Sequence, residues 1–174
     1  MPIKPPDAGE YNPYFDRYIS LVPAGDFEEL LNENTTEAIN FFAQLPEALH
    51  DYSYGRDKWT IKQVLLHITD TERVMQYRAL MAARGDNETP QSAMNENIFA
   101  QNAAVSNRSM QDLLAEFTIV RASTNCLLQN LTSEQTTWGI IANGHIITPR
   151  AIGYIIIGHV LHHINIINER YLKQ

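Results

Sequence analysis

The sequence predicts an all-α protein, a four-helix bundle with a small β-hairpin. Four long segments carry apolar residues at helical spacing, and residues that typically start or stop helices flank each of them. Hydrophobic residues make up 44% of the chain, which is enough to fill a core. At 174 residues the chain suits one well-buried domain, so we expect a single domain over residues 1–174.

The amino-terminal part of the chain is predicted to be an arm followed by the first long helix. Residues 1–13 are polar and proline-rich and show no periodicity. The next segment, PYFDRYISLV, predicts one or two helical turns before Pro23. Asp26 then suits the N-cap of the first long helix, which should end near Pro46 because proline interrupts helical hydrogen bonding.

The second long helix has the clearest boundaries. Thr60 and Gln63 fit a capping box at its start, and Gly85 can supply the left-handed residue that ends it after Arg84. A long connection follows, with a short helix expected near residues 95–103. Because this connection is long, a crossover is as consistent with the sequence as an up-down-up-down path.

The carboxyl-terminal half predicts two more long helices separated by a hairpin. Ser109 opens the third long helix. Residues 138–147 place Asn143-Gly144 between two β-branched runs, which is the preferred chemistry of a two-residue type I′ turn. Pro149 suits the first position of the last helix.

Composition excludes several classes of partner. The chain carries 13 Lys and Arg against 20 Asp and Glu, a formal net charge of −7, with no basic cluster, so we expect no nucleic-acid binding. Histidines and an asparagine interrupt the most apolar segment, so we expect no membrane span. Cys126 is the only cysteine, and the amino terminus does not resemble a signal peptide. We therefore expect a cytoplasmic protein, with Cys126 in its core.

Three histidines lie on apolar helix faces in distant parts of the chain. His159 and His163 are four residues apart and share one helix face, while His67 lies on the second long helix. A single buried histidine is usually explained by hydrogen bonds to its neighbours. Three converging imidazoles would instead bind a transition metal and leave one coordination position open, as catalytic zinc sites do. Spacing alone favours neither interpretation.

Three further residues lie near this predicted site. His162 points about 60° away from His159 and is predicted at the rim. Asp70 lies about one turn after His67 and could orient an imidazole, although a surface carboxylate is the simpler interpretation. Arg78 lies further along the His67 face. It would bind an anionic substrate group or, as we favour here, pair with Glu116 or another carboxylate.

The last helix is apolar on a second side as well. Ile157, Leu161 and Ile164 lie nearly opposite the paired histidines, so this side should also be buried. Either the arm and hairpin cover it or a second subunit does. On this basis we predict a homodimer.

Three blocks of sequence together resemble the DinB superfamily of bacterial four-helix bundles. They are KWTIKQVLLHITDTERVMQYRALMAARGD, NRSMQDLLAEFTIVRAST and NGHIITPRAIGYIIIGHVLHHINIINERYL. The resemblance implies a bundle with a crossed connection. It also implies one divalent metal, most often zinc or nickel, with iron and manganese as alternatives, held by His67, His159 and His163.

The resemblance also implies a class of reaction. Relatives include transferases that use low-molecular-weight thiols, so our first expectation is transfer of a small-molecule thiol to an electrophilic substrate. A metal-dependent hydrolase is the alternative, and a non-catalytic metal-binding or stress-response module is a third possibility. The sequence assigns no general base. It contains no P-loop and no dinucleotide-binding fingerprint, which argues against those chemistries.

Overall fold

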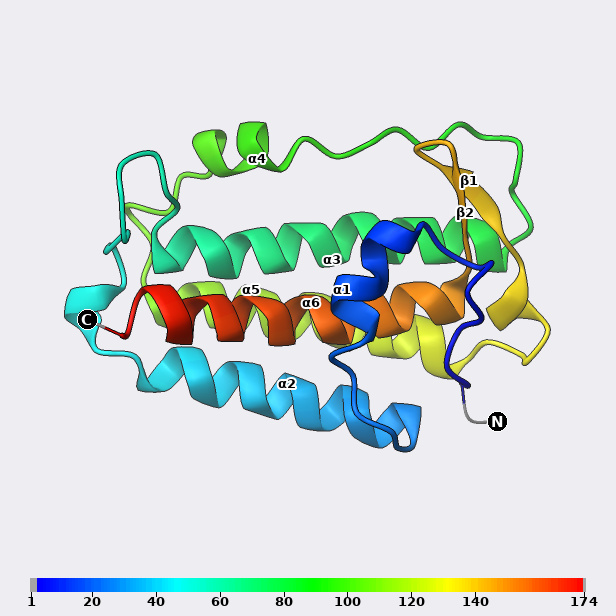
Figure 1. The fold of residues 1–174 in the computed structure, drawn as a ribbon, viewed down its shortest axis with the longest axis horizontal. Coiled ribbons are helices and arrows are strands. Elements are labelled where there is room, and N and C mark those ends of the chain that lie inside the picture. Colours follow the sequence, from blue (N-terminus) through cyan, green and yellow to red (C-terminus); the bar gives the residue numbers. More distant parts are fainter. Residues whose placement is uncertain (1–2, 174) are drawn as a thin grey trace.

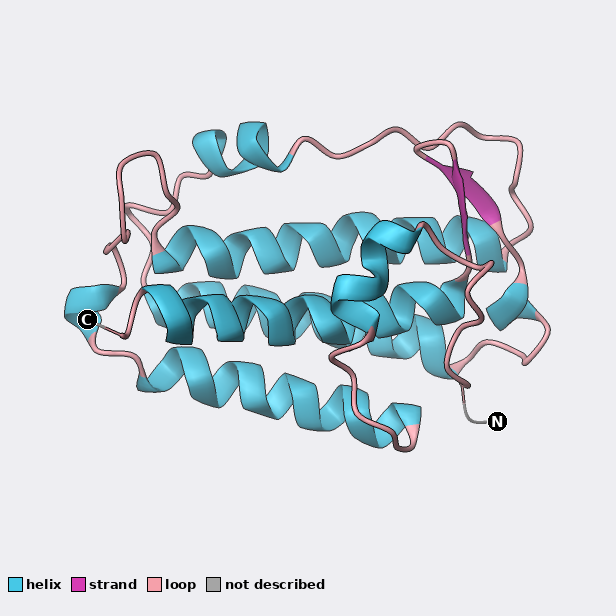
Figure 2. Cartoon of the chain, in the orientation of Figure 1, coloured by secondary structure: helices cyan, strands magenta, loops and turns pink. Residues whose placement is uncertain are grey.

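The computed structural model describes residues 3–173 and shows a bundle of four long helices (Figures 1 and 2). The predicted fold class is therefore confirmed. The long helices are α2 (Phe27–Gln44), α3 (Ile61–Ala83), α5 (Met110–Gln129) and α6 (Pro149–Arg170).

The predicted helix boundaries follow from capping. Asp26 accepts hydrogen bonds from the backbone of the first turn of α2. At the start of α3, the Gln63 backbone N–H donates to Thr60 Oγ1 over 3.2 Å, and the Thr60 backbone N–H donates to Gln63 Oε1 over 2.8 Å. Gly85 has a φ of +76° directly after the C-cap of α3, as predicted for a left-handed stop.

Short elements fill the connections between the long helices. They are η1 (Pro13–Phe15), α1 (Asp16–Ile19), η2 (Glu47–Leu49), α4 (Glu96–Asn102), η3 (Gln135–Thr137), β1 (Ile140–Ala142) and β2 (His145–Ile147). The strands pair antiparallel, with Ala142 opposite His145. Asn143 and Gly144 both have positive φ, at 50° and 78°, which confirms the predicted hairpin turn.

The helices are connected in a crossed order. α3 packs against α5 and α6, and α2 packs against the same two helices, so α2 and α3 lie on opposite sides of the bundle although they are consecutive long helices (Figure 1). α3 and α5 are neighbours that run in the same direction (Figure 1). The chain must therefore return along the length of the bundle between them, which explains the long connection that carries α4.

A buried ion pair crosses the core, and the sequence analysis did not predict it. Arg121 of α5 is 1% exposed and donates to both carboxylate oxygens of Glu72 on α3 over 2.8–3.0 Å. Arg121 also donates to the Asn34 side-chain oxygen on α2 over 3.0 Å. The pair thus ties three long helices together. Cys126, which we expected in the core, is exposed on α5.

The chain itself buries both apolar sides of α6. Ile157 and Ile164 are 1% and 5% exposed, and α1 lies across the middle of the helix (Figure 1). α1 approaches so closely that a Cβ at Gly158 would collide with the Tyr18 backbone. The observation that suggested a dimer is therefore accounted for within one chain, and the homodimer stays a prediction.

One helix among residues 3–173 is long and apolar enough to cross a membrane by length and composition. It is α6 with its extension, Pro149–Leu172, and 67% of its most apolar window is buried inside the bundle. The histidines and asparagine that led us to expect no membrane span do not take this segment below the threshold of that test. A core helix enclosed by its own bundle passes the same test.

Candidate metal centre

The structure brings the three predicted histidines together from two helices. His67 projects from α3, and His159 and His163 project from successive turns of α6. His159 Nε2 lies 3.1 Å from His67 Nε2 and 3.0 Å from His163 Nε2. One nitrogen from each ring can be chosen so that all three lie within 4.8 Å of one another.

Local packing fixes the orientation of these rings. α3 and α6 pack along each other, and the spacing of four residues stacks His159 and His163 on one face of α6. The Trp59 ring, just before the N-cap of α3, lies against the His67 ring with centroids 4.7 Å apart. The contact between α3 and α6 therefore determines both the packing of the core and the position of the three histidine rings.

Burial keeps the three imidazoles neutral. Desolvation lowers the pKa of His67 from 6.5 to about 4, with a smaller contribution from His162. Desolvation, followed by the neighbouring histidines, also lowers the pKa values of His159 and His163 well below the ordinary value. Each ring consequently has a free lone pair at neutral pH, which is the form that binds metals.

The donor set fits a divalent transition metal. Two nitrogens that each lie about 2.0–2.1 Å from a tetrahedral ion are roughly 3.3 Å apart. The observed separations of 3.0 and 3.1 Å are within a few tenths of an ångström of that value. Within residues 3–173, the cluster contains no fourth His, Cys, Asp or Glu. A metal held here would therefore keep an open coordination position.

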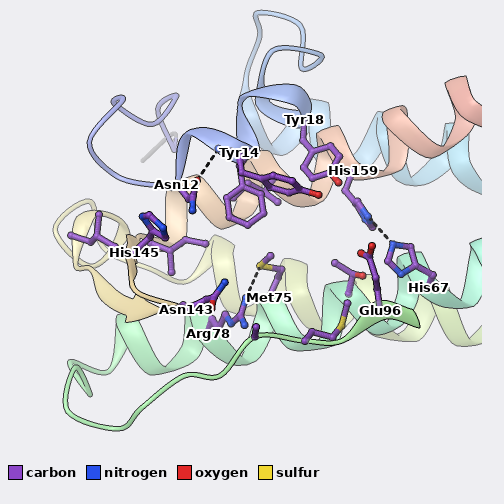
Figure 3. Close-up of a pocket in the computed structure, with 18 residues that line it drawn as sticks. Asn12, Tyr14, Tyr18, His67, Met75, Arg78, Glu96, Asn143, His145 and His159 are labelled. Atoms are coloured by element: carbon purple, nitrogen blue, oxygen red, sulfur yellow. Dashed lines mark hydrogen bonds between the residues drawn. The ribbon is translucent and has the colours of Figure 1, made fainter. Parts of the chain in front are cut away.

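A cavity of about 340 Å³ lies beside the histidines (Figure 3). His67 and His159 form part of its wall at one end, and Tyr14 of η1 and Tyr18 of α1 cover it. α3, the 84–95 connection and the hairpin complete the lining. The connection is fixed to the hairpin, because the Asn143 backbone N–H donates to the Gln91 carbonyl over 3.1 Å.

Asp70 and His162 lie near the histidines without bonding to them. Asp70 is half-buried and accepts a hydrogen bond from Arg73 over 3.1 Å, and burial raises the pKa of its carboxyl. The His162 ring lies 5.2 Å from the rings of both Tyr18 and His163. His162 therefore lies beside the three-histidine cluster, between the His163 and Tyr18 rings.

Arg78 does not pair with Glu116, so that expectation was wrong. Glu116 instead forms ion pairs with Arg73, over 2.7 Å, and with Arg108. Arg78 donates to the Ser92 carbonyl over 2.6 Å and lines the cavity. Arg73 of α3 and Arg108, in the connection before α5, therefore already neutralise Glu116. Arg78 faces the cavity instead.

Sequence reasoning missed two residues of the site. Tyr18 lies edge-on against the His159 ring, with centroids 5.2 Å apart, and burial raises the pKa of its hydroxyl. Glu96 of α4 points into the cavity on the side of His67 and His159 (Figure 3). Both come from short helices, α1 and α4, whose position against the long helices no pattern in the sequence indicated.

Comparison with known proteins identifies the family. The sequence model of the DinB superfamily matches residues 30–167, which include all three histidines. The chain belongs to the DinB superfamily. The resemblance seen in the sequence is thus confirmed, and no curated protein matches the chain.

One solved structure shows how closely this DinB-superfamily chain follows a known fold. YfiT from Bacillus subtilis is similar with a TM-score of 0.71 over 95% of this chain and 94% of its own. The two sequences are 20% identical, so the likeness concerns the fold. YfiT is described as a probable metal-dependent hydrolase with an unusual four-helix bundle topology, which agrees with the crossed connection seen here.

Proposed function

We propose that this protein is a metal-dependent enzyme that acts on a small molecule. One observation carries the proposal: neutral imidazoles of His67 and His159 form the wall of a cavity, and His163 completes the set. A purely structural site would normally be closed by a fourth protein ligand. Zinc or nickel are the first candidates, because imidazole ligands accept both.

Hydrolysis is the reaction that the geometry supports best. The metal, when bound, supplies Lewis acidity that makes a small nucleophile more acidic. Glu96 is placed to accept the proton of an attacking water, whose oxygen forms a bond to the electrophilic carbon of the substrate. The bond to the leaving group breaks, and the proton moves from Glu96 to that group. Tyr14 and Tyr18 shield the reacting atoms from bulk water.

The volume of the cavity favours hydrolysis over thiol transfer. Small-molecule sites usually span about 300–1,000 Å³, so 340 Å³ accommodates one small organic substrate together with water. Transfer of a thiol requires two organic molecules at the same time. Thiol transfer, our first expectation from the sequence, remains the second candidate on the strength of family resemblance, with the thiol extending out of the cavity.

Activity assays on metal-loaded protein separate these candidates. We expect zinc- or nickel-loaded protein to hydrolyse 4-nitrophenyl esters, and Glu96→Gln to lower kcat by about 10²–10⁴. Glu47→Gln, on the exposed η2 turn, is the matched control and should leave kcat unchanged. Conjugation of bacillithiol to an electrophile without ester hydrolysis would favour the transferase.

A metal-loaded protein inactive in both assays would point to the non-catalytic module. That interpretation also requires the open coordination position to be closed. In nickel-loaded protein, d–d absorption bands that do not change when thiol or azide is added would show a closed site, whereas bands that shift would show an open one.

A further inference from the structure

Three cations are buried among the described residues, and one of them lacks an anionic partner. Lys62, 4% exposed, pairs with Asp51 over 2.8 Å, and Arg121, 1% exposed, pairs with Glu72. Arg78 is 7% exposed. Within residues 3–173, no carboxylate oxygen lies within 4.0 Å of its guanidinium.

The contacts that Arg78 does make are few for a buried charge. One N–H group donates to the Ser92 carbonyl over 2.6 Å, and another lies 3.9 Å from the sulfur of Met75. A guanidinium has five N–H donors and does not lose its proton in proteins, so most of its donors stay available. Burial lowers the pKa of Arg78, because removal from water disfavours the charged form.

The Arg78 side chain faces the same cavity as the histidines. His67, Thr71, Met75 and Arg78 line the cavity in that order along one face of α3. Figure 3 shows His67 and His159 at one end, with Met75 and Arg78 toward the hairpin end. Between them, Thr71 Oγ1 is buried with no hydrogen-bond partner. A hydroxyl without a hydrogen-bond partner and a guanidinium without an anionic partner thus line the same wall of the cavity.

We propose that the substrate carries a carboxylate, which Arg78 binds at the end of the cavity away from the histidines. Thr71 then hydrogen-bonds a polar atom in the middle of the substrate. This inference rests on the proposed function, because it takes the histidines as the reacting end. Met75, which the guanidinium contacts, lies roughly 12 Å beyond His67 along the helix axis. The carboxylate and the reacting group should be separated by about that length.

Charge and shape both favour a carboxylate over a phosphate. The Arg78 fork matches the two oxygens of a carboxylate, and one positive charge balances one negative charge. Glu96 at the histidine end, and the net charge of −7, oppose a dianion. A phosphate ester would need further cations in the cavity, and in the described lining Arg78 is the only Lys or Arg.

Binding to metal-free protein tests this inference separately from the proposed reaction. The probes are 6-phenylhexanoate and 6-phenylhexanamide, which share a shape and differ in charge. By calorimetry or NMR, wild-type protein should bind the acid about tenfold or more tightly than the amide. Arg78→Met should abolish that preference with little effect on the amide. Arg84→Met, at the exposed end of α3, should preserve it.

The competing explanation is that Arg78 only holds the 84–95 connection through Ser92. In that case Arg78→Met would weaken the acid and the amide equally, which would overturn the proposal. Equal binding of both probes to wild type, or binding of neither, would also overturn it. If Arg78→Met does not fold, Arg78→Lys keeps the charge and loses the fork. We expect it to reduce the preference for the acid several-fold.

Discussion

The metal-free protein should lose stability as the pH falls from about 7.5 to about 5.5, because its buried histidines resist protonation. In the unfolded chain His67 takes up a proton near its ordinary pKa of 6.5, whereas in the folded chain it does so near pH 4. Acid therefore favours the unfolded state. The stabilisation is complete above pH 6.5 and decreases as the pH falls toward 4.

The size of this loss follows from the two pKa values of His67. Between about pH 7.5 and 5.5, the shift from 6.5 to about 4 removes about 1.4 kcal/mol from the free energy of unfolding. His159 and His163 have pKa values lowered in the same direction, so both increase the loss. The interval lies above the range in which ordinary carboxylates titrate.

Urea denaturation in the presence of EDTA measures this quantity. We expect the free energy of unfolding to be at least about 1.4 kcal/mol lower at the lower pH, with an unchanged m-value. His67→Gln, which cannot take up the proton, should make the loss smaller by about the His67 share. An equal free energy of unfolding at both pH values in wild type would refute the argument that burial keeps these rings neutral.

Three substitutions outside the donor set test other parts of the account. Arg121→Met should lower the free energy of unfolding by about 3–5 kcal/mol in chemical denaturation, since it leaves Glu72 charged and buried; a loss below about 1 kcal/mol would contradict this. His162→Ala should retain metal in elemental analysis, and loss as severe as for a ligand variant would show that we misassigned the ring. Gly158→Ala should displace α1 around Tyr18 and speed proteolysis there, whereas unchanged cleavage would argue against tight docking of α1 on α6.

The sequence predicted the helices well because their boundaries are set locally. Capping at Thr60 and the stop at Gly85 depend on residues within one turn, so the pattern contains the information. The same holds for the Asn143-Gly144 turn. The crossed order could not be derived from periodicity, since it depends on which helix faces meet, and family resemblance supplied it.

The sequence could predict residues of the site only where the helical repeat fixes the face on which a side chain lies. The spacing of His159 and His163 places both rings on one face, and the apolar stripe of α3 turns His67 toward them. Tyr18 and Glu96 reach the cavity from the short helices α1 and α4, and where those helices lie depends on tertiary packing. The partner of Arg78 was mispredicted for the same reason. Charge alone identified Glu116 as a candidate, but two nearer arginines bind it.

Metal titration of wild type and of two ligand variants tests the central claim most directly. The account predicts that purified, chelator-treated protein takes up one zinc or nickel ion per chain. It also predicts that His159→Ala and His163→Ala lose this uptake while circular dichroism still shows a helical bundle. Absence of stoichiometric uptake in the wild type, or full retention in both variants, would contradict it.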